Sequence, residues 1–429
     1  MNECLKRSEM TLVQPDMTAT ADDFISRLGA EAASLGFPAA ATPGTLKFAA
    51  GDRFLPELRR RVDQYFKLSG RRPHDCPFMY LKTALIFGCL VGSYVGLLFL
   101  AASWWTALFL AIVLGLSMAA VGFNVQHDGG HQAYSDREWI NKLMAMSLDL
   151  LGGSSYVWAK KHNSVHHSYT NVTGHDDDIN IGFFGRLSPH QPRLGFHRLQ
   201  HFYLWLLYGL LPIKWQLYDD FRDVLLGRIG RHRMPRPKGW DLVVFIAGKA
   251  TFFSLAFVVP LMLHTAGSVL LFYVVASFAQ GVVLSTVFQM AHCVERAAFP
   301  LPRPDDGRIN SAWAVHQVET TVDFARDNRL LSWIIGGLNF QIEHHLFPRV
   351  CHVHYPALAP IVETTCRELG VRYVAHATLL ASIASHFRWL RSMGMPDSED
   401  KSDHRSPDRR GALEVTMPRV GIAAQKGDA

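Results

Sequence analysis

The sequence predicts an all-α integral membrane protein, with four transmembrane helices in two hairpins beneath a cytoplasmic helical cap. Three observations support this prediction. Hydrophobic residues make up 49% of the 429 residues, four segments are apolar enough to span a bilayer, and many of the 21 histidines cluster beside these segments. A helix needs about 20 apolar residues to cross the hydrocarbon core. The net charge of +6 is too small and scattered to indicate a nucleic-acid-binding protein.

The predicted spans form two tight hairpins. The first hairpin comprises residues 83–102 and 104–125, and the second comprises residues 242–263 and 266–290. Lys249 is the one charged residue within these four ranges, and we expect its ammonium group to extend toward water at the cytoplasmic end of its helix. The alternative, buried helices of a soluble protein, is disfavoured because such helices are rarely uncharged over more than about 18 residues.

The positive charges predict the orientation. Lysines and arginines gather before the first span and between the hairpins, whereas the two short turns contain none. Because such residues stay in the cytoplasm, both termini and the long segment between the hairpins are expected there, where the sequon at Asn171 would not be glycosylated. Around the membrane domain, residues 83–392, we expect a flexible segment over 1–45, a helical pre-membrane segment over 46–82 and a disordered tail over 393–429.

Histidines form three clusters at the cytoplasmic ends of these hairpins. His127-Asp-Gly-Gly-His131 places two imidazoles on one face of a helix, and His162-Asn-Ser-Val-His166-His167 and His344-His345 follow. A polar loop would explain one cluster, but three on one side of the membrane indicate a metal centre.

The number and type of these ligands predict the metal. Seven imidazoles exceed the four ligands of a structural zinc ion, so we expect two metal ions, and imidazole suits iron, copper and zinc alike. The six cysteines form no CxxC pair and predict no zinc site of their own. A pair of irons beside a hydrocarbon phase suggests O2 activation for attack on an unactivated C–H bond, which zinc cannot perform because it has no redox chemistry.

These motifs resemble the three histidine boxes of the membrane fatty acid desaturases. The resemblance extends from about Leu46 to about Pro356 and is strongest in His127–His131, His162-Asn-Ser-Val-His166-His167-Ser-Tyr-Thr-Asn and Gly337-Leu-Asn-Phe-Gln-Ile-Glu-His-His-Leu-Phe-Pro348. The third box has Gln341 where many relatives have histidine. In this respect it resembles the front-end branch of the family, whose members desaturate between an existing double bond and the carboxyl end.

The resemblance implies two iron ions as cofactors, O2 as co-substrate and an acyl chain in a hydrophobic tunnel. It implies His292 as an eighth ligand, and His316 as either a further ligand or a neighbour of one. Many front-end relatives carry a fused haem domain marked by His-Pro-Gly-Gly, which this sequence lacks. Electrons are therefore expected from a separate ferredoxin or cytochrome. The acyl carrier stays open among CoA, acyl carrier protein and a membrane lipid.

Further polar residues are candidates to support the metal centre. Asp128, Glu343 and Asp178 are expected to accept hydrogen bonds from ligating imidazoles, with exposed surface charges as the alternative. Asn339 and Gln341 are candidates to hold a water molecule or an acceptor oxygen.

Two glycines interrupt the first box at a place where a helix is expected. Gly129 and Gly130 each cost a helix about 1 kcal/mol relative to alanine. Close approach of the substrate or of another backbone segment would explain them.

Two other functions stay open from the sequence. The first is a related di-iron hydroxylase, epoxidase or ketolase acting on a lipid. The second is a histidine-rich metal transporter, which would need polar ligands within the spans, whereas these spans are nearly free of ionisable residues.

Overall fold

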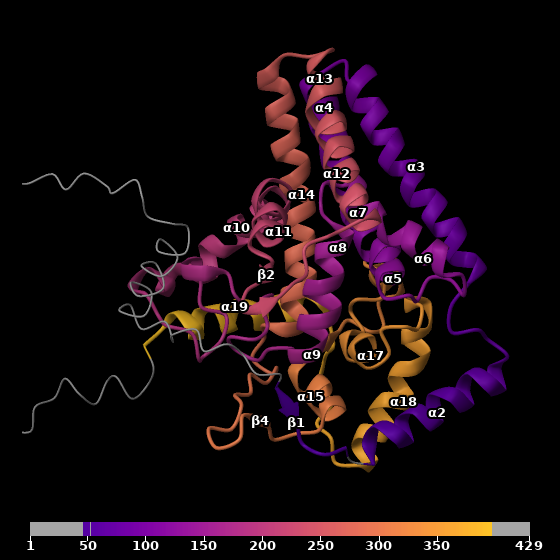
Figure 1. The fold of residues 1–429 in the computed structure, drawn as a ribbon, viewed down its shortest axis with the longest axis vertical. Coiled ribbons are helices and arrows are strands. Elements are labelled where there is room, and N and C mark those ends of the chain that lie inside the picture. Colours follow the sequence, from indigo (N-terminus) through magenta and orange to yellow (C-terminus); the bar gives the residue numbers. More distant parts are fainter. Residues whose placement is uncertain (1–45, 52, 397–429) are drawn as a thin grey trace, which may run out of the picture. The chain divides into compact units, whose positions relative to one another are not determined.

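The computed structural model describes residues 46–51 and 53–396, which are mostly helical (Figure 1). The flexible segment expected over residues 1–45 lies outside the described residues, as does the tail expected over 393–429 apart from its first few residues. Three pairs of two-residue strands accompany the helices: β1 (Lys47–Phe48) with β4 (Arg308–Ile309), β2 (Arg228–Ile229) with β3 (His232–Arg233), and β5 (Asp323–Phe324) with β6 (Ala375–His376). The predicted all-α class is confirmed.

Four helices in the described part of the chain are long and apolar enough to cross a membrane. They are α3 (Pro77–Phe99), α4 (Trp104–Val121), α12 (Trp240–Phe253) and α14 (Ala266–His292). Two of them continue through a π-helical turn: α4 through Gly122–Gln126 into α5 (His127–Gly130), and α12 through Ser254–Val258 into α13 (Val259–Leu261).

The four spans form the two predicted hairpins. Their short connections lie at the same end of the bundle (Figure 1), where His264 Nε2 is 2.8 Å from the Leu98 carbonyl oxygen. Gly115 lets α4 and α14 pack closely, because a Cβ atom at this position would collide with the Ala276 carbonyl oxygen.

The first span begins at Pro77 rather than at the predicted residue 83. Proline is favoured in a first helical turn, where its missing N–H leaves no bond unmade. Lys82 does not end the helix, because its ammonium group is buried and lies 3.0 Å from His352 Nε2. The helix therefore continues six residues before the predicted start of the span.

Lys249 lies within the third span, as predicted, but it does not extend toward water. Its buried ammonium group donates to Asp220 Oδ2 at 2.7 Å and to the Gly152 carbonyl oxygen at 2.6 Å. The expectation of an exposed lysine head group is wrong, because α11 (Asp220–Leu226) brings a carboxylate to it. The ion pair with Asp220, rather than contact with water, therefore stabilises the charge of Lys249 within the span.

The remaining helices form a cap at the other end of the bundle. Its longer helices are α2 (Phe54–Ser69), α10 (Gln200–Lys214), α18 (Tyr355–Glu368) and α19 (Leu379–Gly394). Its shorter helices are α6 (Glu138–Ala145), α7 (Ser147–Leu150), α8 (Ser155–Trp158), α9 (His167–Tyr169), α15 (Trp313–Thr320), α16 (Arg329–Ile334) and α17 (Gln341–Leu346). Short 3₁₀- or π-helical segments complete it over Ala159–His166, Gly182–Phe184, Gly195–Leu199, Trp215–Asp219 and His352–His354.

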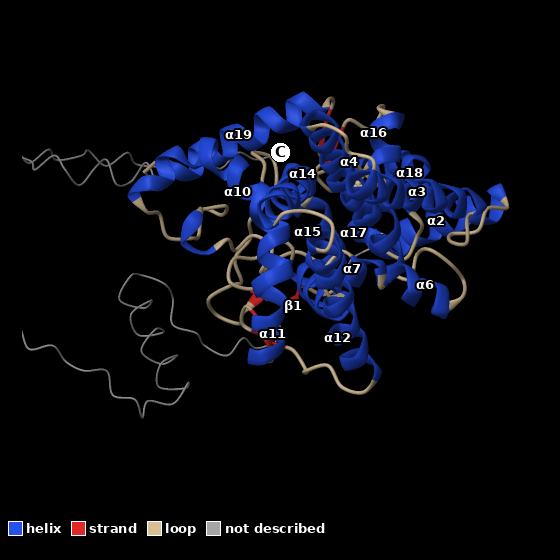
Figure 2. Ribbon diagram, turned by 90° about the horizontal axis from the view of Figure 1, so that it is seen from above, coloured by secondary structure: helices blue, strands red, loops and turns tan. Residues whose placement is uncertain are grey.

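Apolar packing fixes the cap around the ends of the spans. Phe54, Leu58 and Val62 of α2 share one buried core with residues of α15, α17 and α18. Figure 2 shows α10 and α19 on one side of α14, with α2 and α18 on the other. The cap helices therefore enclose the segments that carry the histidine clusters.

Candidate metal centre

The three histidine clusters reach one place in the fold from three different elements. The first lies on α5, the second on the π-helical turn Ala159–His166 and α9, and the third on α17. α5 continues the spanning helix α4 without a break, so a rigid element holds its imidazoles. All the histidines of the three clusters are buried.

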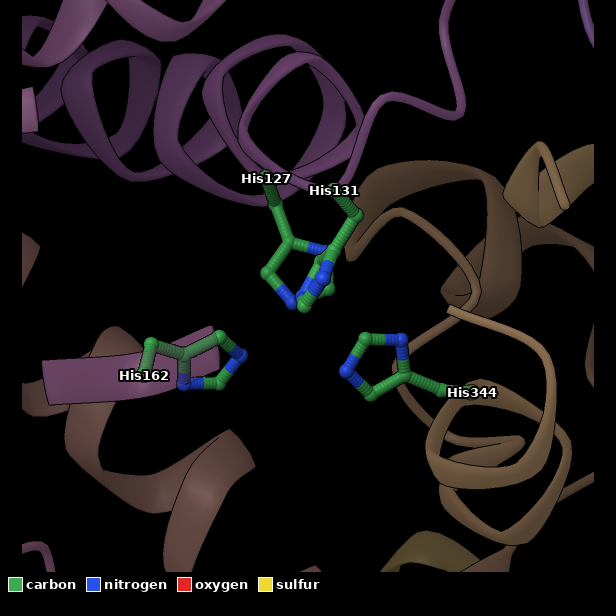
Figure 3. Close-up of side chains that lie close together, drawn as sticks. All are labelled: His127, His131, His162 and His344. Carbon is green, nitrogen blue, oxygen red and sulfur yellow. The ribbon is translucent and has the colours of Figure 1, made fainter. Parts of the chain in front are cut away.

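Four imidazoles form a first group. His127, His131, His162 and His344 each offer a ring nitrogen, and these nitrogens lie within 4.8 Å of one another. The ring centroids of His127 and His344 are 4.4 Å apart, and those of His131 and His162 are 5.1 Å apart. Figure 3 shows the four side chains pointing toward a common centre from opposite sides.

A second group lies beside the first. Ring nitrogens of His166, His292 and His345 also lie within 4.8 Å of one another. His167 lies between the two groups, because its Nε2 atom is 3.2 Å from His162 Nε2 and its ring stacks on His345 at 4.3 Å. His292, at the end of α14, therefore lies with the box histidines, and its role as a ligand stays a prediction.

The chemistry of these nitrogens fits a metal ion. The Nε2 atoms of His131, His166, His344 and His345 are buried, and each lacks a hydrogen-bond partner among the described residues. Leaving a buried polar atom unpaired is costly unless a ligand satisfies it. Burial, and then the neighbouring imidazoles, hold the pKa of His344 and His345 well below the usual value. Neutral imidazole is the form that binds metals.

An aspartate that the sequence analysis missed contacts the second box directly. His166 Nδ1 lies 3.1 Å from Asp176 Oδ2. Burial alone would lower the pKa of His166, but the attraction and hydrogen bond of Asp176 together with the charge of Asp178 outweigh it, and the net shift is upward. Asp178, the predicted acceptor, lies farther away, with Oδ2 3.7 Å from His166 Nδ1 and 3.9 Å from His162 Nδ1. The run of three aspartates after the second box was the available signal in the sequence. It did not indicate which of the three carboxylates would contact His166.

The third box has two further partners that sequence reasoning missed. His345 Nδ1 donates to Gln317 Oε1 at 2.8 Å, and His344 Nδ1 lies 3.3 Å from Tyr355 Oη. Each contact turns the Nε2 atom of its imidazole toward the metal groups. Gln317 directly follows His316, so the string that suggested His316 also contained the residue that contacts a clustered histidine.

Asp128 and Glu343 have other partners than those predicted. Asp128 Oδ2 accepts from His352 Nδ1 at 2.9 Å, and Glu343 Oε1 accepts from Tyr373 Oη at 3.1 Å. The expectation that their carboxylates orient ligating imidazoles is therefore corrected. Each of these two residues is next to a clustered histidine in a helix. Because consecutive side chains of a helix differ in direction by about 100°, the carboxylate lies on a different face from the imidazole.

His316 lies apart from both groups. It belongs to none of the sets of converging ring nitrogens, and its ring lies 5.1 Å from that of Phe48. Burial lowers its pKa to about 4. The structure thus places His316 on α15 itself, which also carries Gln317, and does not bring its ring nitrogens to the metal groups.

Gln341 and Asn339 differ in their relation to the centre. Gln341 Nε2 lies 3.1 Å from His292 Nε2, so this amide borders the second group. Asn339 Nδ2 lies 3.4 Å from the Ala325 carbonyl oxygen, and its buried Oδ1 atom has no partner among the described residues. The predicted role of either residue in holding water or oxygen stays a prediction.

Asn171 joins the second box to the end of α14. Its buried amide donates to the carbonyl oxygens of His292 at 2.9 Å, Thr320 at 3.1 Å and Ala298 at 3.2 Å. Asn171, the first residue of the apparent glycosylation motif, therefore has a structural role in the site.

The two glycines of the first box permit close packing, as expected. A Cβ atom at Gly129 would lie 2.6 Å from the Ala145 backbone nitrogen, and one at Gly130 would collide with the Trp158 ring. The Trp158 ring in turn stacks on His162 with 4.6 Å between centroids. Backbone and aromatic packing therefore explain both glycines.

An apolar cavity of about 600 Å³ lies among the four spans. Its lining residues include Leu90, Met118, Leu151, Phe252 and Phe272. Met118 precedes His127 by nine residues on the same continuous helix, which corresponds to roughly 14 Å along the axis. The cavity is lined by residues of the four spans and lies on the spanning side of the histidine groups.

Four helices that could span a membrane, joined to a buried group of converging histidines, define the fold and the candidate site. Comparison with known proteins identifies its class. The family described as Fatty acid desaturase matches residues 102–377, well over half of the chain.

Three relatives show how far the similarity extends. The chain is 37% identical to an sn-1 linoleoyl-lipid 6-desaturase of Arthrospira platensis and 38% identical to one of Synechocystis sp., over 82% of the chain and 96% and 99% of those proteins. It is 39% identical to an acyl-lipid (8-3)-desaturase of Physcomitrium patens, over 82% of the chain and 74% of that protein.

The chain belongs to the fatty acid desaturase family. It is a membrane oxidoreductase that introduces a double bond into fatty acyl chains. The transporter interpretation is set aside, and desaturation takes precedence over oxygen insertion as the reaction.

Proposed function

We propose that the chain binds two iron ions and uses O2 and two external electrons to form a cis double bond in an acyl chain of a membrane lipid. One ion would be held by His127, His131, His162 and His344, and the other by His166, His167, His292 and His345. The observation that carries this proposal is the convergence of buried ring nitrogens from all three boxes and α14 into adjacent groups. Iron held there would supply the O2-dependent redox chemistry that an unactivated C–H bond requires and that zinc lacks.

The chain's own residues contribute orientation and exclusion of water. Asp176, Gln317 and Tyr355 contact the Nδ1 atoms of three clustered histidines and leave the opposite nitrogen free for a metal. Because the histidines sit at the ends of packed helices, these directions are fixed before substrate binds. The buried setting keeps bulk water from the reacting carbons, and the apolar cavity among the spans would receive the methyl end of the acyl chain.

The relatives support an acyl-lipid substrate and a new bond on the carboxyl side of existing ones. Two of them are named as sn-1 linoleoyl-lipid 6-desaturases and the third as an acyl-lipid (8-3)-desaturase. Gln341 in the third box, as in the front-end pattern, agrees with this regiochemistry. We propose a membrane lipid as the acyl carrier and a separate ferredoxin or cytochrome as the electron donor.

The proposal is tested by metal content and by product. Purified protein should contain about two irons per chain, and expression in a host supplied with linoleate should give lipids with one additional double bond, located by mass spectrometry. A protein that purifies with zinc alone would contradict the redox mechanism. A hydroxylated product would assign oxygen insertion instead, and a new bond on the methyl side would exclude the front-end assignment.

The cytoplasmic orientation has its own test. A cysteine introduced at Thr265, in a short turn, should react with a membrane-impermeant maleimide in intact cells. A cysteine at Asp305, exposed on the cap, should react only after the membrane is permeabilised. The reverse pattern would invert the proposed topology.

A further inference from the structure

Two cysteines lie against each other outside the metal centre. Cys76 is the residue before α3, and Cys351 follows α17 by five residues. The Cys351 backbone N–H donates to the Pro73 carbonyl oxygen at 2.8 Å, which fixes the two segments together. Cys76 packs against the apolar core that contains Cys351. The two thiols are therefore neighbours although 275 positions separate them in the sequence.

The two thiols have different surroundings. Cys351 is fully buried, whereas Cys76 is partly exposed. Cys76 Sγ lies 3.3 Å from His354 Nε2, and it sits at the N-terminus of a 23-residue helix, where the helix dipole favours negative charge. A nearby imidazole and a helix N-terminus are the settings that make a thiolate in reactive cysteines.

The electrostatics of the pair agree with this geometry. A hydrogen bond from the Cys351 thiol lowers the pKa of Cys76 to about 5, with a further contribution from His354 and against the effects of burial and the Asp128 charge. Burial, and then Cys76 itself, raise the pKa of Cys351 well above its usual value. At neutral pH one sulfur is a partly exposed thiolate, and its neighbour is a protonated, enclosed thiol.

We propose that Cys76 and Cys351 form a peroxide-reactive dithiol, in which Cys76 attacks the peroxide and Cys351 resolves the product into a disulfide. The Cys76 thiolate attacks one oxygen of hydrogen peroxide, the O–O bond breaks, and the released hydroxide takes up a proton to form water, leaving a sulfenic acid. The Cys351 thiol then attacks this sulfur, an S–S bond forms, and the hydroxyl group leaves with the thiol proton as water. In total, two thiols are oxidised and one peroxide is reduced to two waters.

The oxidant follows from the chemistry of the metal centre, and only this step rests on the proposed function. Reduction of O2 by two electrons and two protons, without oxidation of a substrate, gives hydrogen peroxide. The dithiol lies near that source, because His352, next to Cys351, bonds Asp128, which is next to His127. A disulfide would tie the segment after the third box to the start of the first span.

Peroxide treatment of the purified full-length chain tests the proposal. At about pH 5.5, a thiol with a pKa near 5 is mostly ionised, whereas an ordinary thiol is about 0.1% ionised. After the lower nucleophilicity of the more acidic thiolate is included, Cys76 should still react roughly 20-fold faster than an ordinary cysteine. Peptide mapping by mass spectrometry should find a Cys76–Cys351 disulfide that dithiothreitol reverses.

Internal controls and two variants make the result decisive. Cys293 and Cys366, both buried, should stay reduced at peroxide concentrations that oxidise the pair, and a Cys4→Ser background prevents cross-linking through that residue. Cys351→Ala also removes the hydrogen bond that chiefly lowers the pKa of Cys76, so in this variant Cys76 should react more slowly, stop at the sulfenic acid and be trapped by dimedone. Should that variant fail to fold, Cys76→Ser, at the more exposed position, should leave Cys351 reduced. Oxidation of Cys351 in Cys76→Ser, or a Cys76 that reacts no faster than Cys366, would overturn the proposal.

Discussion

The Nδ1 atom of His345 lies 2.8 Å from the side-chain oxygen of Gln317, which stands on α15 while the histidine stands on α17. This contact fixes the tautomer of a clustered histidine from outside the three boxes. It also requires the imidazole N–H to donate to the amide oxygen, so that the Nε2 atom carries a free lone pair.

Replacement of Gln317 should therefore weaken metal binding. In Gln317→Leu, the acceptor is lost, and we expect a loss of about 10- to 100-fold in metal affinity or activity. In Gln317→Glu, an acceptor is kept, and most of the bound iron should remain. Iron per chain, measured by mass spectrometry of the purified variants, distinguishes the two; equal iron in both would show that the contact has no role in binding.

Substitution of His316 on α15 and of His345 on the neighbouring helix α17 should have different effects on iron content. His345→Ala removes a ring nitrogen of the second group, and it should abolish product and lower the iron content while membrane insertion persists. His316→Ala removes a histidine that joins neither group, and it should keep the iron of the parent protein. A loss of iron in His316→Ala equal to that in His345→Ala would restore His316 as a ligand.

The buried pair of Lys249 and Asp220 should contribute to stability only as a pair. Lys249→Met leaves the Asp220 carboxylate buried without its partner, at a cost of about 3–5 kcal/mol, and should lower the melting temperature in detergent. The double variant Lys249→Met/Asp220→Leu removes both charges and should recover most of the loss. A double variant no more stable than Lys249→Met would contradict the pairing.

The reactivity of Cys76 should depend on pH with an unusual midpoint. Because its pKa is lowered to about 5, its thiolate persists above that pH, and its rate of alkylation by iodoacetamide should fall only as pH drops through about 5. His354→Gln removes the imidazole at 3.3 Å and should move this midpoint upward. Peptide-resolved labelling measures both curves, and a wild-type midpoint near the ordinary value of about 8.5 would contradict the assigned pKa.

Asn171 should be essential to the site although it contacts no metal. Its amide nitrogen contacts three backbone carbonyl oxygens, including that of His292. Asn171→Ala would remove these contacts, at about 1–3 kcal/mol for each carbonyl left buried without a donor. We expect a lower melting temperature and reduced iron content. Asn171→Asp, of similar size but without the amide donors, should be no better; normal iron in both variants would refute this role.

Local sequence is sufficient to define the four spans and the pairing of histidines within each box. Both depend on local geometry: the length of an apolar run sets whether a helix can cross a bilayer, and residues four apart share a helix face wherever that helix lies. The same local rule puts His127 and His131 on one face of their helix. It could not place the charges of Lys82 and Lys249, because their burial depends on distant partners, His352 and Asp220.

Tertiary packing selects the polar groups that support the centre. Asp176 rather than Asp178 contacts His166 most closely, Gln317 rather than its neighbour His316 reaches the third box, and Asp128 turns away to His352. One residue along a helix changes the direction of a side chain by about 100°, so proximity in sequence does not predict contact. The meeting of Cys76 with Cys351 likewise depends on how the cap packs against the first span, which no local pattern encodes.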